Sequence, residues 1–224
     1  MTSTRKLSLC FDLDGTLVDT APDLIAALNH CLEMENLAET DYAAARERIG
    51  FGSKALIIDA LGRAAHEATD ERIAEMQAAF LKYYVANIAV HSRPFEGALD
   101  ALRQFKRQNI DLSVCTNKPG YLARPLIDKL GMTHLFSRII GSDDIGRNKP
   151  HADHIFASAG HRNPNHIVMI GDGAPDSLAA KAARVPCILM SYGYSPQPIY
   201  QLGADIILRR FRDMPDALRR LGKL

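Results

Sequence analysis

The chain lacks the features that mark secreted, membrane-spanning and strongly basic proteins. It has no tryptophan and only four cysteines in 224 residues, and the cysteine spacing fits neither a disulfide framework nor a metal knuckle. No apolar run approaches the roughly 18 residues that a membrane span needs, and the first residues do not have the layout of a signal peptide. Lys and Arg number 27 against 26 acids, so the net charge of +1 does not favour a polyanionic partner. We therefore expect a cytoplasmic monomer or homodimer with reduced thiols that binds neither nucleic acid nor membrane.

The most informative pattern lies in residues 7–20. An apolar run with the alternation of a β-strand ends in Asp12 and Asp14, and a Gly-Thr turn follows. Side chains two apart on a strand leave on the same side, so both acids can project into one crevice at the strand's carboxyl end. Two anions that close need a cation, or one must hold a proton. The alternative interpretation is a plain turn, because Asp-Gly is a common loop dipeptide.

The pattern along the chain predicts two regions of different architecture. Residues 18–88 contain no convincing strand and show helical spacing, with Thr69 as an N-cap. From about residue 94, short β-rich runs alternate with helical segments, which predicts a parallel sheet wound with helices. The predicted strands after the first are 111–116, 138–141, 166–170, 186–190 and 205–208. The predicted crossover helices are 97–108, 121–130, 151–159 and 176–184. The fold class is therefore α/β, with a Rossmann-like core at 1–17 and 89–224 and an all-helical insertion at 18–88.

Polar residues suited to phosphate and a divalent cation follow three more of these strands. Thr116 and Asn117 end the strand at 111–116 and precede a helix, an arrangement that can hold phosphate oxygens. Lys149 lies in the loop after 138–141, and Asp172 and Asp176 follow 166–170. Each signal alone is typical of an ordinary loop or surface residue. Together they place two acids, a hydroxyl, a cation and two more acids on one edge of one sheet.

In this order the four segments resemble the motifs of the haloacid-dehalogenase-like superfamily, and the resemblance covers nearly the whole chain. The helical insertion resembles the small cap of the subgroup that contains phosphoglycolate phosphatase. The strongest local similarity there is the Gly-x-Gly loop around Gly50 and Gly52. The sequence departs from the usual pattern at Gly173, where a hydroxyl residue is frequent, at Arg184, where Gly is frequent, and in the segment 191–200.

The resemblance implies a Mg²⁺-dependent phosphatase that acts through an aspartyl phosphate. Asp12 is then the nucleophile, because a carboxylate attacks phosphorus without needing a base. The cation would be held by the Asp12 carboxylate, the Asp14 backbone carbonyl and the Asp172 carboxylate. The Asp14 carboxyl is left to protonate the leaving oxygen and later to activate water.

The remaining residues of the pattern have supporting roles in this scheme. Thr116 and Asn117 would bind phosphate oxygens, and Lys149 would offset charge that builds on the phosphoryl group. Asp176 would orient Lys149 or a water molecule on the cation. The residues of the helical insertion that we expect to contact substrate are Gly50, Gly52 and Lys54.

The sequence leaves several substrates and one other function class open. Phosphoglycolate is the leading candidate, and a sugar-phosphate phosphatase, a pyrophosphatase or a phosphomutase would use the same scaffold. Thr16 favours hydrolysis, because the similar mutases tend to have Val there. The rival from another class is a non-catalytic module with a phosphorylated aspartate, although receiver domains of that kind are shorter and lack an inserted helical domain.

Three other groups of residues have a plain structural interpretation beside a functional one. Lys54 occupies a position close to a Schiff-base lysine of phosphonoacetaldehyde hydrolases, but those relatives lack the second acid that Asp14 supplies here. His151 and His154 share a helical face and have no evident third metal ligand. Arg46 and Arg48 are either solvated helix cations or contacts for a substrate carboxylate.

Overall fold

The computed structural model describes residues 6–224, which form two compact units. The first comprises the described chain up to Val18 together with Pro94–Leu224, and the second is Asp19–Arg93. The chain passes between them through β2 (Val18–Asp19) and β3 (Arg93–Pro94), which form a two-stranded sheet. The second unit thus begins and ends within a few residues of the helical insertion that the sequence predicts.

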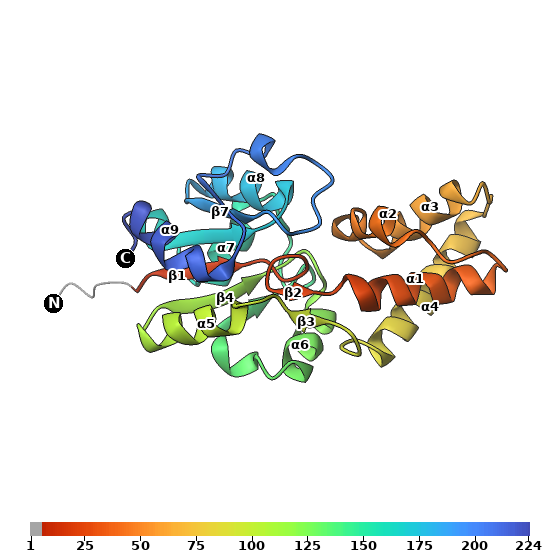
Figure 1. Ribbon diagram of the computed structural model, residues 1–224, viewed down its shortest axis with the longest axis horizontal. Helices are drawn as coiled ribbons and strands as arrows, with labels where there is room; N and C mark the ends of the chain where they lie inside the picture. Colours follow the sequence, from red (N-terminus) through yellow and green to blue (C-terminus); the bar gives the residue numbers. More distant parts are fainter. Residues whose placement is uncertain (1–5) are drawn as a thin grey trace. The chain divides into compact units, whose positions relative to one another are not determined.

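The first unit is built on a parallel sheet of six strands (Figure 1). In spatial order they are β5 (Arg138–Ile140), β4 (Asp111–Cys115), β1 (Ser8–Phe11), β6 (Ile167–Gly171), β7 (Cys187–Met190) and β8 (Ile206–Leu208). All five neighbouring pairs are parallel, and Phe11 at the end of β1 lies between Val114 and Ile170. This arrangement confirms the predicted α/β fold with a Rossmann-like parallel sheet.

The order of the strands reverses at β1. From β1 the chain builds β4 and β5 on one side, and it then crosses to build β6, β7 and β8 on the other. The carboxyl ends of β4, β1 and β6 are therefore neighbours at a topological switch point, where open α/β sheets bind their ligands. The polar residues that follow these strands belong to that edge.

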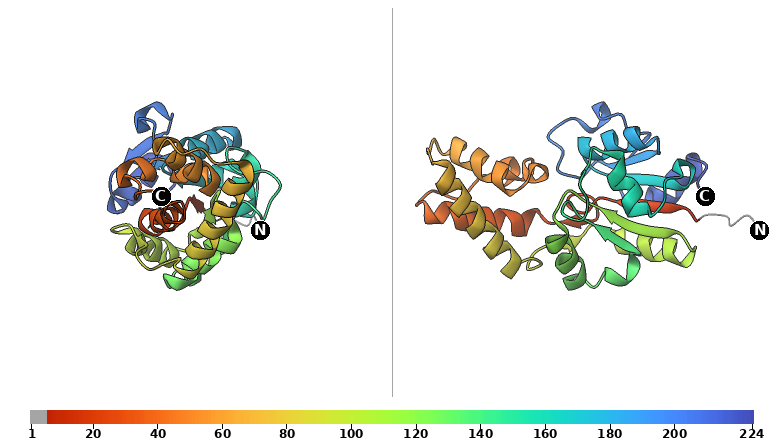
Figure 2. Two further views of the ribbon diagram at one scale, coloured as in Figure 1. Left: turned by 90° about the vertical axis from the view of Figure 1, so that its right-hand side faces the viewer. Right: turned by 180° about the vertical axis from the view of Figure 1, so that it is seen from behind.

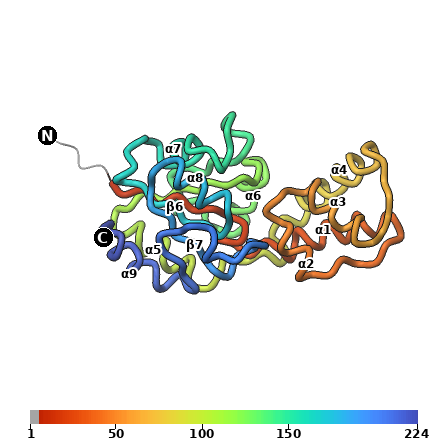
Figure 3. The backbone as a smooth tube through the Cα atoms, turned by 90° about the horizontal axis from the view of Figure 1, so that it is seen from above, coloured from red at the N-terminus to blue at the C-terminus, as the bar shows by residue number. Residues whose placement is uncertain are grey.

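Helices cover both faces of the sheet, as Figures 2 and 3 show for this unit. Helices α7 (Ala152–Ala159) and α8 (Ala174–Ala183) pack on one face, and α5 (Ala98–Arg107) packs on the other. The remaining helices of this unit are α6 (Gly120–Lys129) and α9 (Met214–Arg220). Because both faces are covered, the central strands are apolar at successive positions rather than alternating with polar residues.

Alternate residues of each strand supply the two cores. Cys10 and Met169 belong to the cluster that also contains Ile155 of α7 and Ala180 of α8. On the opposite face the ring of Phe11 lies 6.4 Å from the ring of Phe211. The four cysteines of the chain, three of which belong to the α7 and α8 side, are free and buried.

The second unit is helical. Its helices are α1 (Ala21–Met34), α2 (Tyr42–Arg46), α3 (Ser53–Arg63) and α4 (Asp70–Ala86). The predicted N-cap is present, because the Thr69 side chain accepts a hydrogen bond from the Arg72 amide. Helix α4 packs on α1 and α3 through buried apolar residues. Nowhere in residues 6–224 is there a helix of the length and apolar character needed to cross a bilayer.

Candidate active site

Asp12 is held at the end of β1 by backbone hydrogen bonds. Its amide donates to the Ile170 carbonyl at 2.8 Å, and its Oδ1 accepts from the Leu13 amide at 2.7 Å. The Leu13 carbonyl then accepts from the amides of Thr16, Leu17 and Val18, so the chain turns sharply after the strand. Asp12 therefore directly follows β1, and Asp14 lies in the turn after it.

Lys149 forms the charged centre of the site. Its ammonium lies 2.9 Å from Asp12 Oδ2 and 2.6 Å from Asp176 Oδ1, and its side chain is only 1% exposed. Burial alone would lower the pKa of Lys149, but the Asp12 and Asp176 carboxylates outweigh burial and raise it. Lys149 is therefore a permanent cation that joins two of the predicted acids.

Asp176 lies in the first turn of α8, where both of its oxygens are engaged. Oδ1 accepts from Lys149, and Oδ2 accepts from the amides of Asp172 and Gly173 at 3.1 and 3.0 Å. A carboxylate at this position also compensates the positive end of the helix dipole. The sequence allows Asp176 to orient either Lys149 or a water molecule on the cation. In the structure Asp176 contacts Lys149 directly.

Asp172 is enclosed from two sides. Thr16 Oγ1 donates to its Oδ1 at 2.7 Å, and the Tyr194 amide donates to its Oδ2 at 2.7 Å. Burial, followed by the nearby charges of Asp12 and Asp176, raises the pKa of Asp172 to about 8. The loop 191–198 therefore contacts a predicted metal ligand through the Tyr194 amide.

Two glycines make this enclosure possible. Gly15 has φ +80°, and a Cβ there would lie 2.5 Å from Asp172 Oδ2. A Cβ at Gly193 would overlap the Asp172 side chain. The turn after β1 and the loop after β7 can therefore approach Asp172 only with glycine at these two positions.

Three acids, of which Asp172 and Asp176 are buried and Asp12 is partly buried, fit a divalent cation. Asp12, Asp172 and Asp176 each offer an oxygen, and these atoms lie within 4.8 Å of one another. Burial, together with the nearby charge of Asp176, raises the pKa of Asp12 to about 6 despite the opposing charge of Lys149. Carboxylate oxygens are the ligands that Mg²⁺ prefers. Because Asp176 already accepts three hydrogen bonds, Asp12 and Asp172 are better placed to hold the ion.

The loop after β4 joins the same network. The Thr116 amide donates to the Ile140 carbonyl at 3.1 Å, and Thr116 Oγ1 accepts from the Lys118 amide at 3.1 Å. The Asn117 side-chain amide donates to the Lys149 carbonyl at 3.0 Å. The structure thus brings together all four segments that the sequence places at one edge of the sheet.

Lys118 is a residue of the site that sequence reasoning missed. Its ammonium lies 3.2 Å from both carboxylate oxygens of Asp14. The sequence shows Lys118 only as the third residue of a Thr-Asn-Lys run, where a lysine is typical of a surface loop. The two acids of the first motif therefore have separate lysine partners, Lys149 for Asp12 and Lys118 for Asp14.

His154, which the sequence offers only as a possible metal ligand beside His151, has a different role in the structure. Its Nδ1 accepts from the Lys149 amide at 3.2 Å, and its Nε2 lies 3.1 Å from the Ile140 carbonyl, which identifies the neutral tautomer with hydrogen on Nε2. Burial and then the charge of Lys149 lower the pKa of His154 to about 4. Both ring nitrogens are used by the backbone, so His154 braces the loop that carries Lys149 and is not a metal ligand.

Comparison with known proteins decides the family. The family model described as haloacid dehalogenase-like hydrolase matches residues 9–190, which include the four segments that carry the acids, Thr116 and Lys149. The chain belongs to this hydrolase family.

Individual relatives of the hydrolase agree with the family match. Phosphoglycolate phosphatase from Caulobacter vibrioides is 38% identical over 94% of this chain and 90% of its own length. The phosphoglycolate phosphatase from Agrobacterium fabrum is 36% identical, with 93% and 90% covered. The crystal structure of a predicted phosphoglycolate phosphatase from Haemophilus somnus superposes with a TM-score of 0.88 at 31% identity, and 96% of this chain and 99% of that chain are covered.

The residues of the helical insertion that the sequence predicts to contact substrate lie in the second unit. Gly50 belongs to the 3₁₀ turn Ile49–Phe51, and Gly52 has φ +88° directly before α3. Lys54 is exposed in the first turn of α3. Nearby, the Arg48 guanidinium pairs with Asp59 at 3.0 Å.

Proposed function

We propose that this hydrolase is a phosphatase that cleaves a small phosphomonoester, with phosphoglycolate as the substrate, through a phosphorylated Asp12. The observation that supports this most directly is the contact of Lys149 with both Asp12 and Asp176, beside the buried Asp172. This arrangement holds a carboxylate next to a fixed cation and next to a group of acids that fits a second, divalent cation. Phosphoryl transfer requires such an arrangement, because catalysis depends on positioning and on balancing charge.

Asp12 is the nucleophile of the proposal. A pKa of about 6 leaves its carboxylate mostly ionised at neutral pH, so it needs no general base. The Leu13 amide and the Lys149 ammonium fix the orientation of its two oxygens. A carboxylate held this way loses little conformational freedom when it attacks phosphorus.

The cation of the proposal is Mg²⁺, held by the Asp12 and Asp172 carboxylates and the Asp14 backbone carbonyl. When bound, it would neutralise charge between the attacking carboxylate and the phosphate dianion. Lys149 balances charge from the protein side at a distance of 2.9 Å from Asp12. Asp176 keeps Lys149 in place rather than contributing a ligand.

Asp14 and Thr116 complete the proposed reaction. Asp12 attacks phosphorus as the bond to the leaving oxygen breaks, and Asp14 in its acid form gives that oxygen a proton. Asp14 then takes a proton from the water that attacks the aspartyl phosphate, which releases phosphate and restores the Asp12 carboxylate. Because Thr116 Oγ1 accepts from the Lys118 amide, its own hydrogen is available for a phosphate oxygen.

The relatives named phosphoglycolate phosphatase support the choice of substrate. Their similarity extends over more than nine-tenths of this chain, so it includes the helical unit as well as the sheet. Within that unit we propose Gly50, Gly52 and Lys54 as the residues that contact the rest of the substrate. An ammonium such as that of Lys54 is complementary to the carboxylate of phosphoglycolate.

A phosphate-release assay tests the proposal. The purified chain is supplied with Mg²⁺ and, in separate reactions, phosphoglycolate, several sugar phosphates, pyrophosphate and 4-nitrophenyl phosphate. We expect phosphoglycolate to give the largest kcat/KM and a chelator to abolish release. Asp12→Asn is expected to be inactive, and Asp100→Asn, which alters an exposed acid of α5, is the matched control.

Two outcomes would contradict the proposal. A stable phosphoprotein without release of phosphate would favour the signalling module, and activity that depends on a bisphosphate activator would favour a mutase. A larger kcat/KM for a sugar phosphate or pyrophosphate would leave the chemistry intact and overturn the substrate.

A further inference from the structure

Lys118 occupies a position that the proposed reaction leaves without a role. It lies between Thr116 and Pro119 in the loop that joins β4 to α6, and its side chain is 5% exposed. Its ammonium is 3.2 Å from each oxygen of the Asp14 carboxylate, whose side chain is 18% exposed. A lysine is rarely buried to this extent without a specific partner.

The contact is suited to fixing an orientation. An ammonium within hydrogen-bond distance of both oxygens holds the carboxyl group in one place, because rotation about the Cα–Cβ bond of Asp14 would carry both oxygens away from Lys118. Without a partner, that bond can adopt any of its staggered rotamers. The Lys118 side chain is more buried than that of a surface ion pair, and its ammonium can still donate to one oxygen of Asp14 when the other oxygen carries the proton.

The backbone near both residues is also constrained. The Lys118 amide donates to Thr116 Oγ1, so one residue contacts the proposed phosphate-binding hydroxyl through its backbone and Asp14 through its side chain. Asp14 lies within the turn in which the Gly15 amide donates to the Val18 carbonyl. Lys118 can therefore restrain the Asp14 side chain, which extends from a hydrogen-bonded turn.

We propose that Lys118 is a positioning residue that keeps the Asp14 carboxyl aimed at the leaving oxygen. This inference rests on the proposed function, in which Asp14 transfers a proton to that oxygen. Proton donation matters most when the leaving group is a strong base and least when it is a weak base. The contribution of Lys118 must therefore depend on the leaving group.

The test compares kcat/KM for leaving groups of different basicity. The substrates are phosphoglycolate and ethyl phosphate, with alkoxide leaving groups, and 4-nitrophenyl phosphate, whose phenolate leaves readily. Because kcat/KM reports steps up to phosphorylation of Asp12, slow hydrolysis of the aspartyl phosphate does not obscure the result. Lys118→Met is expected to lower kcat/KM roughly 10- to 100-fold for both alkyl phosphates and less than about threefold for the aryl phosphate.

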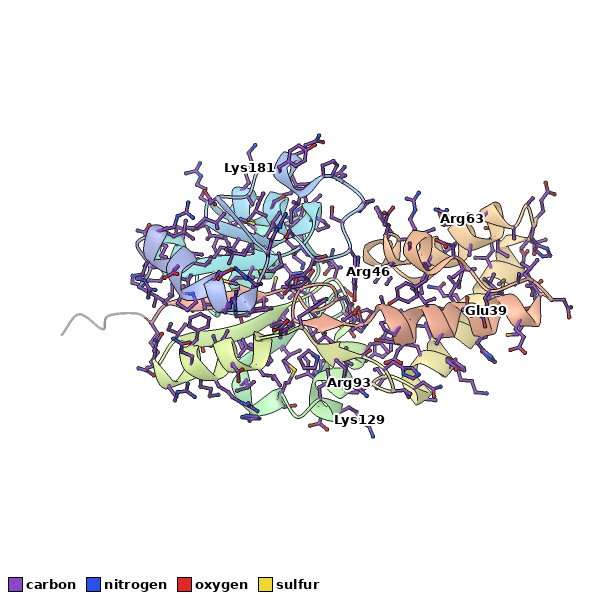
Figure 4. All side chains as sticks on the ribbon, viewed as in Figure 1. Glu39, Arg46, Arg63, Arg93, Lys129 and Lys181 are labelled. Carbon is purple, nitrogen blue, oxygen red and sulfur yellow. The ribbon has the colours of Figure 1, made fainter. Side chains whose placement is uncertain are left out.

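Two further variants define the specificity of this effect. Lys118→Arg is expected to restore part of the loss on alkyl phosphates, because a guanidinium can bind both oxygens of a carboxylate. Lys129→Met makes the same substitution at an exposed position of α6 and is expected to leave all three substrates unaffected (Figure 4). Lys118→Gln gives the same comparison if thermal melting shows that Lys118→Met does not fold.

The decisive measurement is the double variant with Asp14→Asn. If Lys118 acts through Asp14, Lys118→Met causes no further loss on alkyl phosphates once Asp14 is replaced. An equal loss on aryl and alkyl phosphates would overturn the inference, and so would a loss that persists in the Asp14→Asn background. A rise in KM confined to phosphoglycolate would also overturn it, because Lys118 would then bind the substrate carboxylate.

These outcomes separate the inference from the proposed function. If the unaltered chain releases phosphate from none of the three substrates, the proposed function fails, and the inference fails with it. If the unaltered chain is active and the Lys118 variants show no dependence on the leaving group, the inference alone fails.

Discussion

The two units bury different kinds of residue. Among the described residues of the first unit, buried charges gather at one edge of the sheet, where Lys118, Lys149, Asp172 and Asp176 lie. In the second unit the buried side chains are apolar or aromatic except at its two ends, where Thr20, Asp23 and Ser92 are found. The first unit therefore holds charges that must be paired to be tolerated, whereas the interior of the second serves packing. Substitutions of the buried charges in the first unit should therefore change turnover, whereas substitutions inside the second unit should mainly change the free energy of unfolding.

The largest effect is expected from Asp12→Asn. Loss of the nucleophile should lower kcat by about 10⁴-fold or more. The free energy of unfolding should fall little, because the substitution also removes the repulsion between the Asp12 and Asp172 carboxylates, which raises the pKa of Asp172. Steady-state turnover and thermal melting measure the two quantities. A variant that keeps substantial activity would refute the role of Asp12.

Lys149→Met is expected to change both activity and stability. It removes the cation shared by Asp12, which is partly buried, and Asp176, which is buried. Turnover should fall about 10²- to 10³-fold. The free energy of unfolding should fall by about 3 kcal/mol, because removing one partner of a buried ion pair leaves uncompensated charge. Lys181→Met, at an exposed position of α8 (Figure 4), is the control for both measurements.

Local patterns in the sequence predict the architecture and most of the candidate site. The strand before Asp12 is visible because three apolar residues directly precede the acid, and the neighbouring strands follow from the alternation of short apolar runs with helices. The sequence also predicts Thr116, Lys149 and Asp172 as site residues, because each lies at the end of a predicted strand or in the loop after one. Parallel strands bring such positions to one edge whatever the details of packing.

Contacts between distant segments could not be predicted in the same way. The pairing of Lys118 with Asp14 joins residues 104 apart, and the contact of Tyr194 with Asp172 joins the loop after β7 to the residue that follows β6. In the sequence, His154 is notable only because it lies three residues after His151. That spacing is as compatible with a metal site as with hydrogen bonds to the backbone. In each case the partner is chosen by packing in three dimensions, and the sequence carries no periodic signal for it.

Asp23→Ala should separate stability from catalysis in the second unit. The Asp23 carboxylate is 2% exposed and accepts from the amides of His91 and Ser92 and from the Ser92 hydroxyl, at 2.6 to 3.1 Å. These bonds join the first turn of α1 to the segment that leaves the unit. Losing them leaves buried donors unpaired and should cost about 3 kcal/mol.

The measurement for Asp23→Ala is hydrogen exchange of α1 together with turnover at a temperature where the variant is folded. Exchange in α1 should accelerate, while kcat should change far less than it does for Lys149→Met. Glu39→Ala, which removes an exposed acid of the same unit, is the control (Figure 4). Unchanged exchange would show that the buried carboxylate does not stabilise the unit.

The smallest effect is expected from His154, and it appears only as pH falls. The pKa of His154 is about 4 in the folded chain and near its ordinary value of 6.5 when unfolded. Between these values the unfolded chain binds the additional proton, so stability is lost as pH falls below about 6.5. From pH 7 to pH 5 this single group should contribute a loss of about 2 kcal/mol.

His154→Gln tests this by removing the titrating group while keeping a donor for the Ile140 carbonyl. Urea denaturation measures the unfolding free energy of the original chain and of the variant at pH 7 and at pH 5. Between these two pH values the original chain should lose about 2 kcal/mol more than the variant does. His134→Gln, at an exposed position, controls for the loss of a histidine elsewhere in the unit. A constant difference across this range would mean that His154 carries a proton in the folded chain, and a charged imidazole could not accept from the Lys149 amide through Nδ1. The brace between β5 and the Lys149 loop would then have to come from other contacts.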